Sequence, residues 1–254
     1  MRFLFTIQYL GTRYAGWQSQ TNAVGIQQVI EAALANVCGT PVRVSGAGRT
    51  DSGVHASAQQ AHADIPIRID ERGIVLAVNT RLPGDIRIVE ARRVEADFHC
   101  RFEPHEKTYE YRIWSGSVAN VFRAPTHAHV PQALDVDRMA RAVEPLKGRH
   151  DFRAFTVADP EVSSTWRTIR DASVAITADA SVSDVGGRAM AIRVSADGFL
   201  RFMVRRIAGS LIEIGSGRLD IDGIEAALEP HYGEARWTAP PEGLTLVEVT
   251  YDRA

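Results

Sequence analysis

Apolar residues recur along the first part of the chain at spacings that predict alternating strands and helices. Over 24–39 they return every three or four residues, which is typical of an amphipathic helix, and Gly39 can end that helix. Apolar runs and alternation predict strands over 2–10, 41–45, 59–65 and 86–94, with a second helix over 71–79. The helices should cover a sheet.

The second part of the chain repeats this alternation. Charged and aromatic side chains alternate over 107–115, as in a half-buried strand, and apolar spacing predicts a helix over 136–146 that Gly148 ends. The pattern then predicts strands over 167–176 and 189–196, a helix over about 200–214, a short helix over 221–228 and a final strand over 244–251. We expect the loop over 182–187 to be mobile. Together the two parts predict an α+β protein.

Composition describes an ordinary globular protein. The chain has 254 residues, of which 45% are hydrophobic, enough for one or two domains of about 100–200 residues each. The first residues lack an apolar core of signal-peptide length, and no stretch approaches the roughly 20 apolar residues of a membrane span, so we expect a cytoplasmic protein with no membrane partner. Cys38 and Cys100 lack disulfide or zinc-ligand spacing and are expected to be small core residues.

Charge is distributed unevenly, although the formal net charge is only −2. Between residues 193 and 218 five arginines accompany two acidic residues, whereas residues 219–254 carry eight acids and two arginines. This segregation is compatible with a basic groove on a weakly acidic body, and so with a nucleic-acid partner. The chain also contains far more arginine than lysine. A GC-rich genome would produce this preference without any nucleic-acid partner.

The segment 46–56, GAGRTDSGVHA, is the strongest candidate for chemistry, because Asp51 and Arg49 stand there among small residues. Glycines let the backbone approach a ligand closely. The spacing fits neither a phosphate-binding P-loop nor a dinucleotide fingerprint, and no second acid lies between Glu31 and Asp64 to pair with Asp51. A glycine-rich turn in which Asp51 caps its own backbone remains an alternative.

The segment 48–56 resembles the signature G-R-T-D-A-G-V-H-A of the tRNA pseudouridine synthase A (TruA) family. Segment 9–20, YLGTRYAGWQSQ, resembles the opening Y-D-G-T-x-Y-x-G-W-Q-x-Q of that family. Further blocks follow in the family's order: LPGDI at 82–86, FHCR at 98–101, KTYEY at 107–111, HDF at 150–152, RTI at 167–169, FLRFMVRRIAG at 199–209 and PPEGL at 240–244. The departures are Leu10, Ser52, Glu110 and Arg206.

The resemblance implies the pseudouridine synthase fold. In that fold two similar halves form a continuous mixed, mainly antiparallel sheet flanked by helices, with a central RNA-binding cleft. The N-terminal half, 1–104, would carry the catalytic Asp loop, and the C-terminal half, 105–254, would carry the tyrosine and arginine of the active site.

The resemblance also implies roles for five residues. Asp51 matches the catalytic aspartate, and Arg205 the arginine that pairs with it. Tyr109 matches the tyrosine that stacks on the target uracil, Arg49 a residue that helps hold the target nucleotide out of the stack, and Leu244 an aliphatic wall of the pocket. On pattern alone, Arg205 could be a surface arginine, Tyr109 a core aromatic residue and Leu244 a core leucine.

The implied activity is isomerisation of uridine to pseudouridine at positions 38, 39 and 40 of the tRNA anticodon stem-loop, by a homodimer that uses no metal and no organic cofactor. A non-catalytic tRNA-binding or tRNA-folding chaperone module is the alternative, although it would not require Asp51, Tyr109 and Arg205 together. A carboxylate hydrolase such as a nucleosidase is less favoured, because it would normally need a second acid or a metal.

Overall fold

The computed structural model describes residues 1–254 except 19–21, 161, 178–185, 230–232, 234 and 252–254. Within the described part, ten strands belong to a large mixed sheet flanked by helices, which confirms the predicted α+β class. The chain divides into two compact units: Met1–His105 with Leu246–Ala254 (unit 1), and Glu106–Thr245 (unit 2). The predicted loop over 182–187 lies largely outside the described residues, which resume at Gly186.

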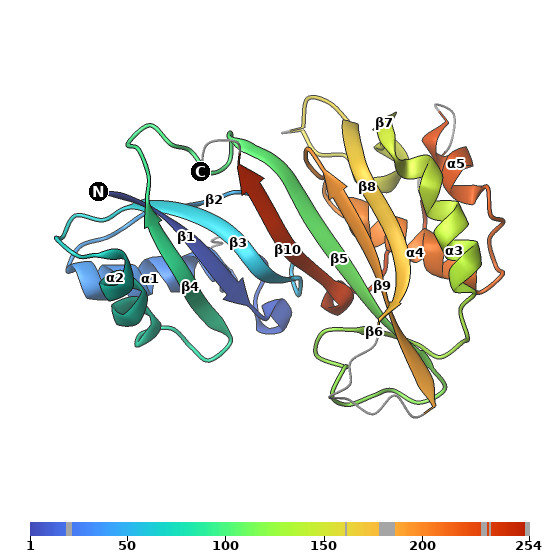
Figure 1. The fold of residues 1–254 in the computed structure, drawn as a ribbon, viewed down its shortest axis with the longest axis horizontal. Coiled ribbons are helices and arrows are strands. Elements are labelled where there is room, and N and C mark those ends of the chain that lie inside the picture. The colour runs from blue at the N-terminus through green and yellow to red at the C-terminus, as the bar shows by residue number, and fades with distance from the viewer. Residues whose placement is uncertain (19–21, 161, 178–185, 230–232, 234, 252–254) are drawn as a thin grey trace. The chain divides into compact units, whose positions relative to one another are not determined.

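Unit 1 places two helices along an antiparallel sheet (Figure 1). In this sheet β1 pairs with both β3 and β4, and β2 adds to β3. The elements are β1 Arg2–Tyr9, α1 Ile26–Cys38, β2 Val44–Gly46, β3 His55–Asp64, α2 Glu71–Asn79 and β4 Ile86–Arg93. The apolar stripe of α1 is buried, as its spacing predicted.

Unit 2 is built in the same way from later segments. Strand β9 pairs antiparallel with β5 and β8, β8 pairs with β7, and β6 runs parallel to β5. The elements are β5 Pro104–Gly116, whose residues from Glu106 on belong to this unit, β6 Ala128–Val130, α3 Val136–Val143, β7 Gly148–Asp151, β8 Trp166–Thr177, β9 Gly187–Ala196, α4 Met203–Gly215 and α5 Gly223–Leu228. Strand β10, Leu244–Tyr251, starts in unit 2 with Leu244 and Thr245, and from Leu246 on it belongs to unit 1. Helix α3 packs on α4 and β8 (Figure 1).

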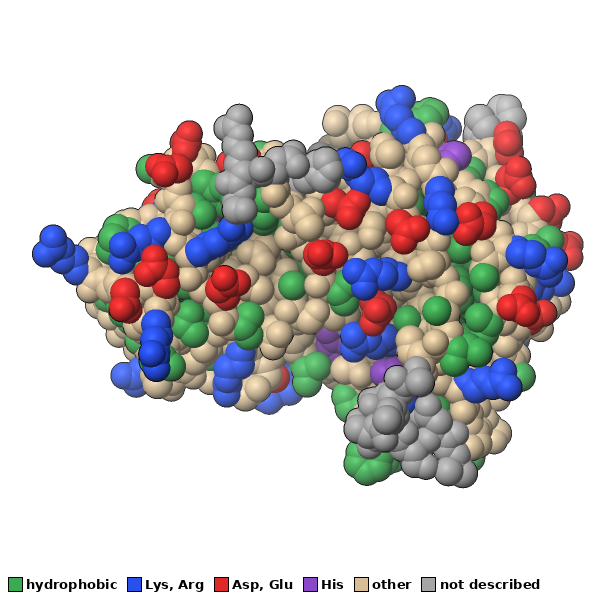
Figure 2. Space-filling view, viewed as in Figure 1, with side chains coloured by type: hydrophobic (Ala, Val, Ile, Leu, Met, Phe, Trp, Pro, Cys, Tyr) green, Lys and Arg blue, Asp and Glu red, His purple; other side chains and the backbone are tan. Residues whose placement is uncertain are grey.

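None of the helices in the described residues has the length and apolar run needed to cross a bilayer. On the face drawn in Figure 2, Lys and Arg side chains stand among Asp and Glu side chains rather than in a separate basic patch.

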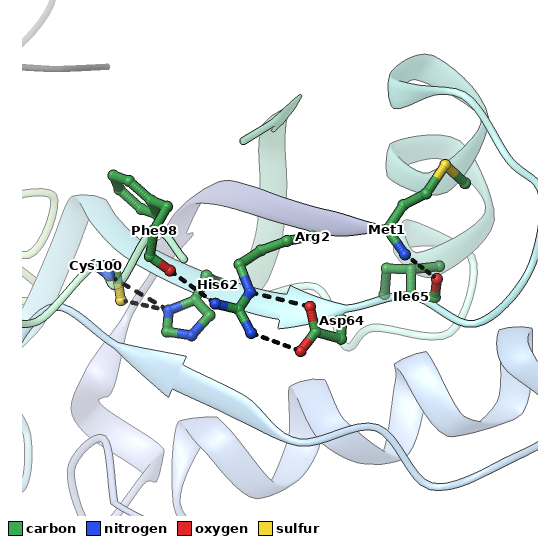
Figure 3. Close-up of polar contacts among 7 residues, drawn as sticks. All are labelled: Met1, Arg2, His62, Asp64, Ile65, Phe98 and Cys100. Atoms are coloured by element: carbon green, nitrogen blue, oxygen red, sulfur yellow. Dashed lines mark hydrogen bonds and ion pairs between the residues drawn. The ribbon is translucent and has the colours of Figure 1, made fainter. Parts of the chain in front are cut away.

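A polar cluster in unit 1 ties the segment after β4 to β1 and β3 (Figure 3). Arg2 donates two hydrogen bonds to Asp64 and one to the Phe98 carbonyl. His62 Nδ1 accepts from the Cys100 backbone N–H at 3.4 Å, and the Cys100 thiol donates to the Ser45 carbonyl at 2.9 Å. Cys100 is fully buried, as predicted for a core thiol.

Stability should fall as pH falls below neutrality, because of His62. Burial, with nearby positive charge on His99 and Arg2, lowers the pKa of His62 to about 4. In the unfolded chain the pKa is about 6.5, so the unfolded state takes up this proton first and the free energy of unfolding decreases between about pH 6.5 and 4. Melting temperatures measured across that range should show the decrease.

The variant His62→Gln tests the source of this effect. Glutamine can still accept a hydrogen bond but does not titrate, so the melting temperature should depend less on pH in the same window. The melting temperature of this variant should still depend on pH to some extent, because burial also lowers the pKa of His127 in unit 2 to about 4. A slope equal to that of the wild type would show that His62 is not its cause.

Candidate active site

Asp51 lies in the turn between β2 and β3, on a segment held mainly by backbone hydrogen bonds. The turn closes through the Val54 N–H, which donates to the Asp51 carbonyl at 3.2 Å. At the start of the segment, the Ala47 N–H donates to the Gln60 carbonyl at 2.7 Å. Asp51 is half-buried and Arg49 is exposed, so both can meet a ligand that approaches this loop.

The segment 11–17, from the opening motif, forms a frame around the Asp51 loop. The Gly11 N–H donates to His55 Nδ1 at 2.9 Å, and the Trp17 N–H donates to the Thr50 carbonyl at 3.1 Å. The backbones also approach so closely that a β-carbon on Gly11 would lie 1.9 Å from the Val54 carbonyl oxygen. We did not predict from the sequence that these two distant motifs form one substructure. Their glycines, which permit close approach of two backbones, were the signal that could have indicated it.

Ser52, which stands where the family usually has alanine, adds a hydrogen bond to this frame. Its hydroxyl donates to the Tyr14 carbonyl at 3.2 Å, and the Gly53 N–H donates to the same carbonyl at 3.3 Å. The exposed Leu10, a second departure, precedes Gly11 and donates its backbone N–H to the Asp85 carbonyl. Both departures therefore leave the loop supported.

Tyr109 lies on β5, opposite Val194 of β9, and only 8% of its surface is exposed. Its ring meets Phe199 edge-to-face, with centroids 5.0 Å apart and an interplanar angle of 86°. Such contacts fix the ring plane. The neighbouring Glu110, another departure from the family pattern, is ion-paired with Arg112 at 2.7 Å.

Arg205 is a half-buried residue of α4 whose side chain is oriented by two neighbours. Its Nε donates to the Ala239 carbonyl at 2.8 Å, and its guanidinium carbon lies 5.2 Å from the centre of the Phe202 ring. We predicted that the helix would include Arg201, which is wrong: α4 begins at Met203, and Phe202 before it has a positive φ of 63°. Arg201 nevertheless lies over the same ring, at 4.9 Å.

Leu244 begins β10 and is buried beside β5. A β-carbon on the preceding Gly243 would lie 2.7 Å from the Tyr111 ring, and the Tyr111 hydroxyl donates to the Pro240 carbonyl at 2.9 Å. Burial raises the pKa of Tyr111, Glu242 raises it further and Arg205 lowers it. The segment 239–244 thus packs against Arg205 of α4 and Tyr111 of β5 within unit 2.

Two of the five arginines over 193–218 are engaged within the protein and are excluded from the predicted basic groove. Arg206 is only 7% exposed and donates to the carbonyls of Ala154 and Thr156, at 3.2 and 2.6 Å. Arg218 is paired with Glu213 through two hydrogen bonds of 2.6 and 2.7 Å. Arg206 therefore serves the packing of unit 2, and it is not a candidate for contact with phosphate.

Arg201→Ala and Arg206→Met should consequently have different effects. Arg206→Met removes the donor from two buried carbonyls and should lower the free energy of unfolding by about 1–3 kcal/mol. Arg201 is exposed, so its replacement should leave stability near that of the wild type and reduce the slope of log K for tRNA against log salt by about 0.7–0.9. Urea unfolding and binding titrations at several salt concentrations measure both quantities. Equal salt slopes for Arg201→Ala and the wild type would contradict the phosphate contact.

Among the described residues, no group of three or more His, Cys, Asp and Glu side chains is placed to hold a metal ion.

Comparison with known proteins shows the family to which this chain belongs. A family model described as tRNA pseudouridine synthase matches residues 6–103 and 142–252, and so includes the Asp51 loop, Arg205 and Leu244. The chain belongs to the tRNA pseudouridine synthase family. Proteins named tRNA pseudouridine synthase A from two strains of Streptococcus pneumoniae, Taiwan19F-14 and Hungary19A-6, are 39% and 38% identical to it over 253 residues. Each alignment covers 99% of both chains, so the family resemblance extends beyond the motifs.

Proposed function

We propose that this chain isomerises uridine to pseudouridine in tRNA, at positions 38, 39 and 40 of the anticodon stem-loop. Membership of the tRNA pseudouridine synthase family supports the reaction class. The observation that carries the proposal for the site is the Asp51 loop, where a half-buried carboxylate and an exposed arginine stand on a frame of close backbone contacts.

The reaction breaks the bond between N1 of uracil and C1′ of ribose and forms a bond between C5 and C1′. C5 then loses its proton and N1 gains one, so the atoms balance without an oxidant, a reductant or water. Asp51 is the proposed catalytic carboxylate, acting on the ribose or the uracil as a nucleophile or as a base at the sugar. This chemistry requires no metal or organic cofactor, and the proposal includes neither.

The remaining site residues are proposed to bind the target nucleotide. Arg49 would hold the nucleotide outside the base stack, an extrusion that costs a few kcal/mol. Tyr109 would stack on the uracil, and Arg205 would pair with Asp51 and favour its ionised form. Leu244 would form an aliphatic wall of the pocket. These assignments rest on the match to the family motifs; within unit 2, Phe199 orients the Tyr109 ring and the Ala239 carbonyl orients Arg205.

Unmodified tRNA transcripts provide the test. Each transcript should carry a single uridine at position 38, 39 or 40, with cytidine in the other two positions, and pseudouridine should be mapped at nucleotide resolution. We expect pseudouridine at the remaining uridine and nowhere else. Binding without modification would favour a tRNA-binding or chaperone module, and release of uracil would favour a hydrolase.

Two further parts of the proposal concern the assembled protein. We propose that it acts in the cytoplasm as a homodimer. Sedimentation equilibrium with and without tRNA measures the assembly, and a monomer under both conditions would contradict it.

A further inference from the structure

A buried polar network lies directly behind the Asp51 loop. The hydroxyls of Tyr9 and Thr50 are 2.9 Å apart, and Gln59 Nε2 donates to Tyr9 at 3.3 Å and to the Gly48 carbonyl at 3.0 Å. The exposed fractions of Tyr9, Thr50 and Gln59 are 3%, 7% and 0%. All of these contacts lie within unit 1, and Gly48 and Thr50 belong to the loop itself.

Donor and acceptor rules give the network a direction. Both hydrogens of Gln59 Nε2 are used, one on the Gly48 carbonyl and one on the Tyr9 oxygen. Tyr9 then satisfies its own hydrogen by donating to Thr50 Oγ1. Burial raises the pKa of Tyr9 to about 12, so the hydroxyl keeps its proton. The chain of donors therefore runs from Gln59 through Tyr9 to Thr50, the residue before Asp51.

The strand geometry directs these side chains towards the loop. The pairing of β1 with β3 shifts register between Ile7 and Tyr9, so that Ile7 opposes Gln59 while Tyr9 opposes Ala56. A β-bulge of this kind changes the direction of side chains and is common next to active sites. Tyr9 and Gln59 can thus meet beneath one loop although they come from different strands.

Stability alone does not explain the polarity of this network. Gln59 Oε1 is buried and accepts no hydrogen bond from the described residues. Such an atom costs about 1–3 kcal/mol, and the amide of Gln59 is kept in spite of that cost while its Nε2 serves the Gly48 carbonyl and Tyr9. Proteins depart from good packing chemistry mainly where function requires it.

We propose that Tyr9 and Gln59 are positioning residues that hold Thr50, and through it the Asp51 carboxylate, in the orientation that the reaction needs. The inference rests on the proposed function. The backbone frame of Gly11 and Trp17 fixes where the loop lies, and the network fixes the rotation of the peptide segment that carries Asp51. The orientation of the Asp51 carboxylate matters because a displacement of about 1 Å at a reacting group can reduce turnover about 100-fold.

The test uses near-isosteric variants that remove single members of the network. Tyr9→Phe and Thr50→Val each remove a hydroxyl, and Gln59→Met removes both amide groups. We expect each to lower kcat for pseudouridine formation by about 10- to 100-fold while KM for tRNA stays within about threefold. Thr50→Ser keeps the hydroxyl and should restore kcat to near the wild-type value.

Tyr251→Phe is the matched control. Tyr251 is another tyrosine of unit 1, and its hydroxyl donates a hydrogen bond to the Cys100 carbonyl at 3.0 Å. Tyr251→Phe removes one hydrogen bond and Tyr9→Phe removes two, so both variants should have a lower melting temperature than the wild type, Tyr9→Phe by the larger amount. Only Tyr9→Phe should lose turnover.

Three results would overturn the inference. The first is a kcat within about twofold of the wild type for Tyr9→Phe and Thr50→Val. The second is a raised KM with unchanged kcat, which would assign the network to tRNA binding. The third is an equal loss of turnover in Tyr251→Phe, which would reflect general destabilisation. A wild-type protein that forms no pseudouridine would instead overturn the proposed function.

Discussion

Asp51→Asn should abolish pseudouridine formation, to below about 0.1% of the wild-type rate, because the variant loses the only group proposed to act on the reacting atoms. Asparagine has nearly the same shape as aspartate, and the loop is held by backbone contacts from Val54 and Trp17 that an amide does not disturb. The fold and the affinity for tRNA should therefore persist. Single-turnover mapping of pseudouridine, circular dichroism and a tRNA titration measure the three properties.

Asp70→Asn is the matched control for this substitution. Asp70 caps α2 by accepting a hydrogen bond from the Gly73 N–H at 2.7 Å, and asparagine caps helices about as well as aspartate. Asp70→Asn should therefore leave both the stability and the turnover of the protein near wild-type values. If Asp51→Asn kept more than a few per cent of the wild-type rate, Asp51 would lose its catalytic role.

Local signals predicted many elements of the fold from the sequence. The helix over 71–79 and the strand over 244–251 have the predicted bounds. Both are marked by nearby residues: Asp70 caps α2, and the turn at 241–243 precedes β10. Gly39 likewise ends α1 in the left-handed conformation. The short strands β6 and β7 were missed, because three or four residues carry too little periodicity to be recognised.

The start of one helix and the environment of one arginine were wrongly predicted, because neither is determined by the apolar periodicity of the sequence. The start of α4 is displaced to Met203 because Phe202 has left-handed backbone geometry, which an apolar periodicity does not reveal. The burial of Arg206 depends on carbonyls about 50 residues earlier, at Ala154 and Thr156. Arginines are mostly exposed, so the sequence predicts a surface position, and a buried arginine is recognised only when its hydrogen-bond acceptors are known.

The same distinction applies to the candidate site. A family motif drew attention to Asp51 and Arg49, and the structure places both on one loop. Tyr9 and Gly16 belong to the opening motif and Gln59 to no motif, and the contact of all three with this loop is seen only when β1, the segment 11–17 and β3 are brought together. Sequence can therefore identify the candidate carboxylate, but its supporting frame depends on the folded geometry.

Gly16→Ala should remove most turnover, because the substitution forces the frame away from the Asp51 loop. Gly16 has a φ of +91°, and a β-carbon there would lie 2.5 Å from the Thr50 carbonyl oxygen and 3.1 Å from the Asp51 carbonyl carbon. Real β-carbons essentially never lie within 3.0 Å of such an atom, so the 2.5 Å contact with the Thr50 carbonyl oxygen forces the loop to shift. We expect a loss of kcat of about 100-fold or more, together with destabilisation from the unfavourable φ.

Gly39→Ala separates these two causes. Gly39 also has a positive φ, of +72°, but a β-carbon there would meet nothing within 4 Å. Alanine at Gly39 should therefore cost about 1 kcal/mol of stability through backbone strain alone, and turnover of the folded protein should remain near the wild-type value. Chemical denaturation and single-turnover rates should be measured for both variants at a temperature where both are folded. Equal turnover in the two variants would show that contact between Gly16 and the loop does not govern the reaction, whereas selective loss in Gly16→Ala would tie the rate to the position of the Asp51 loop.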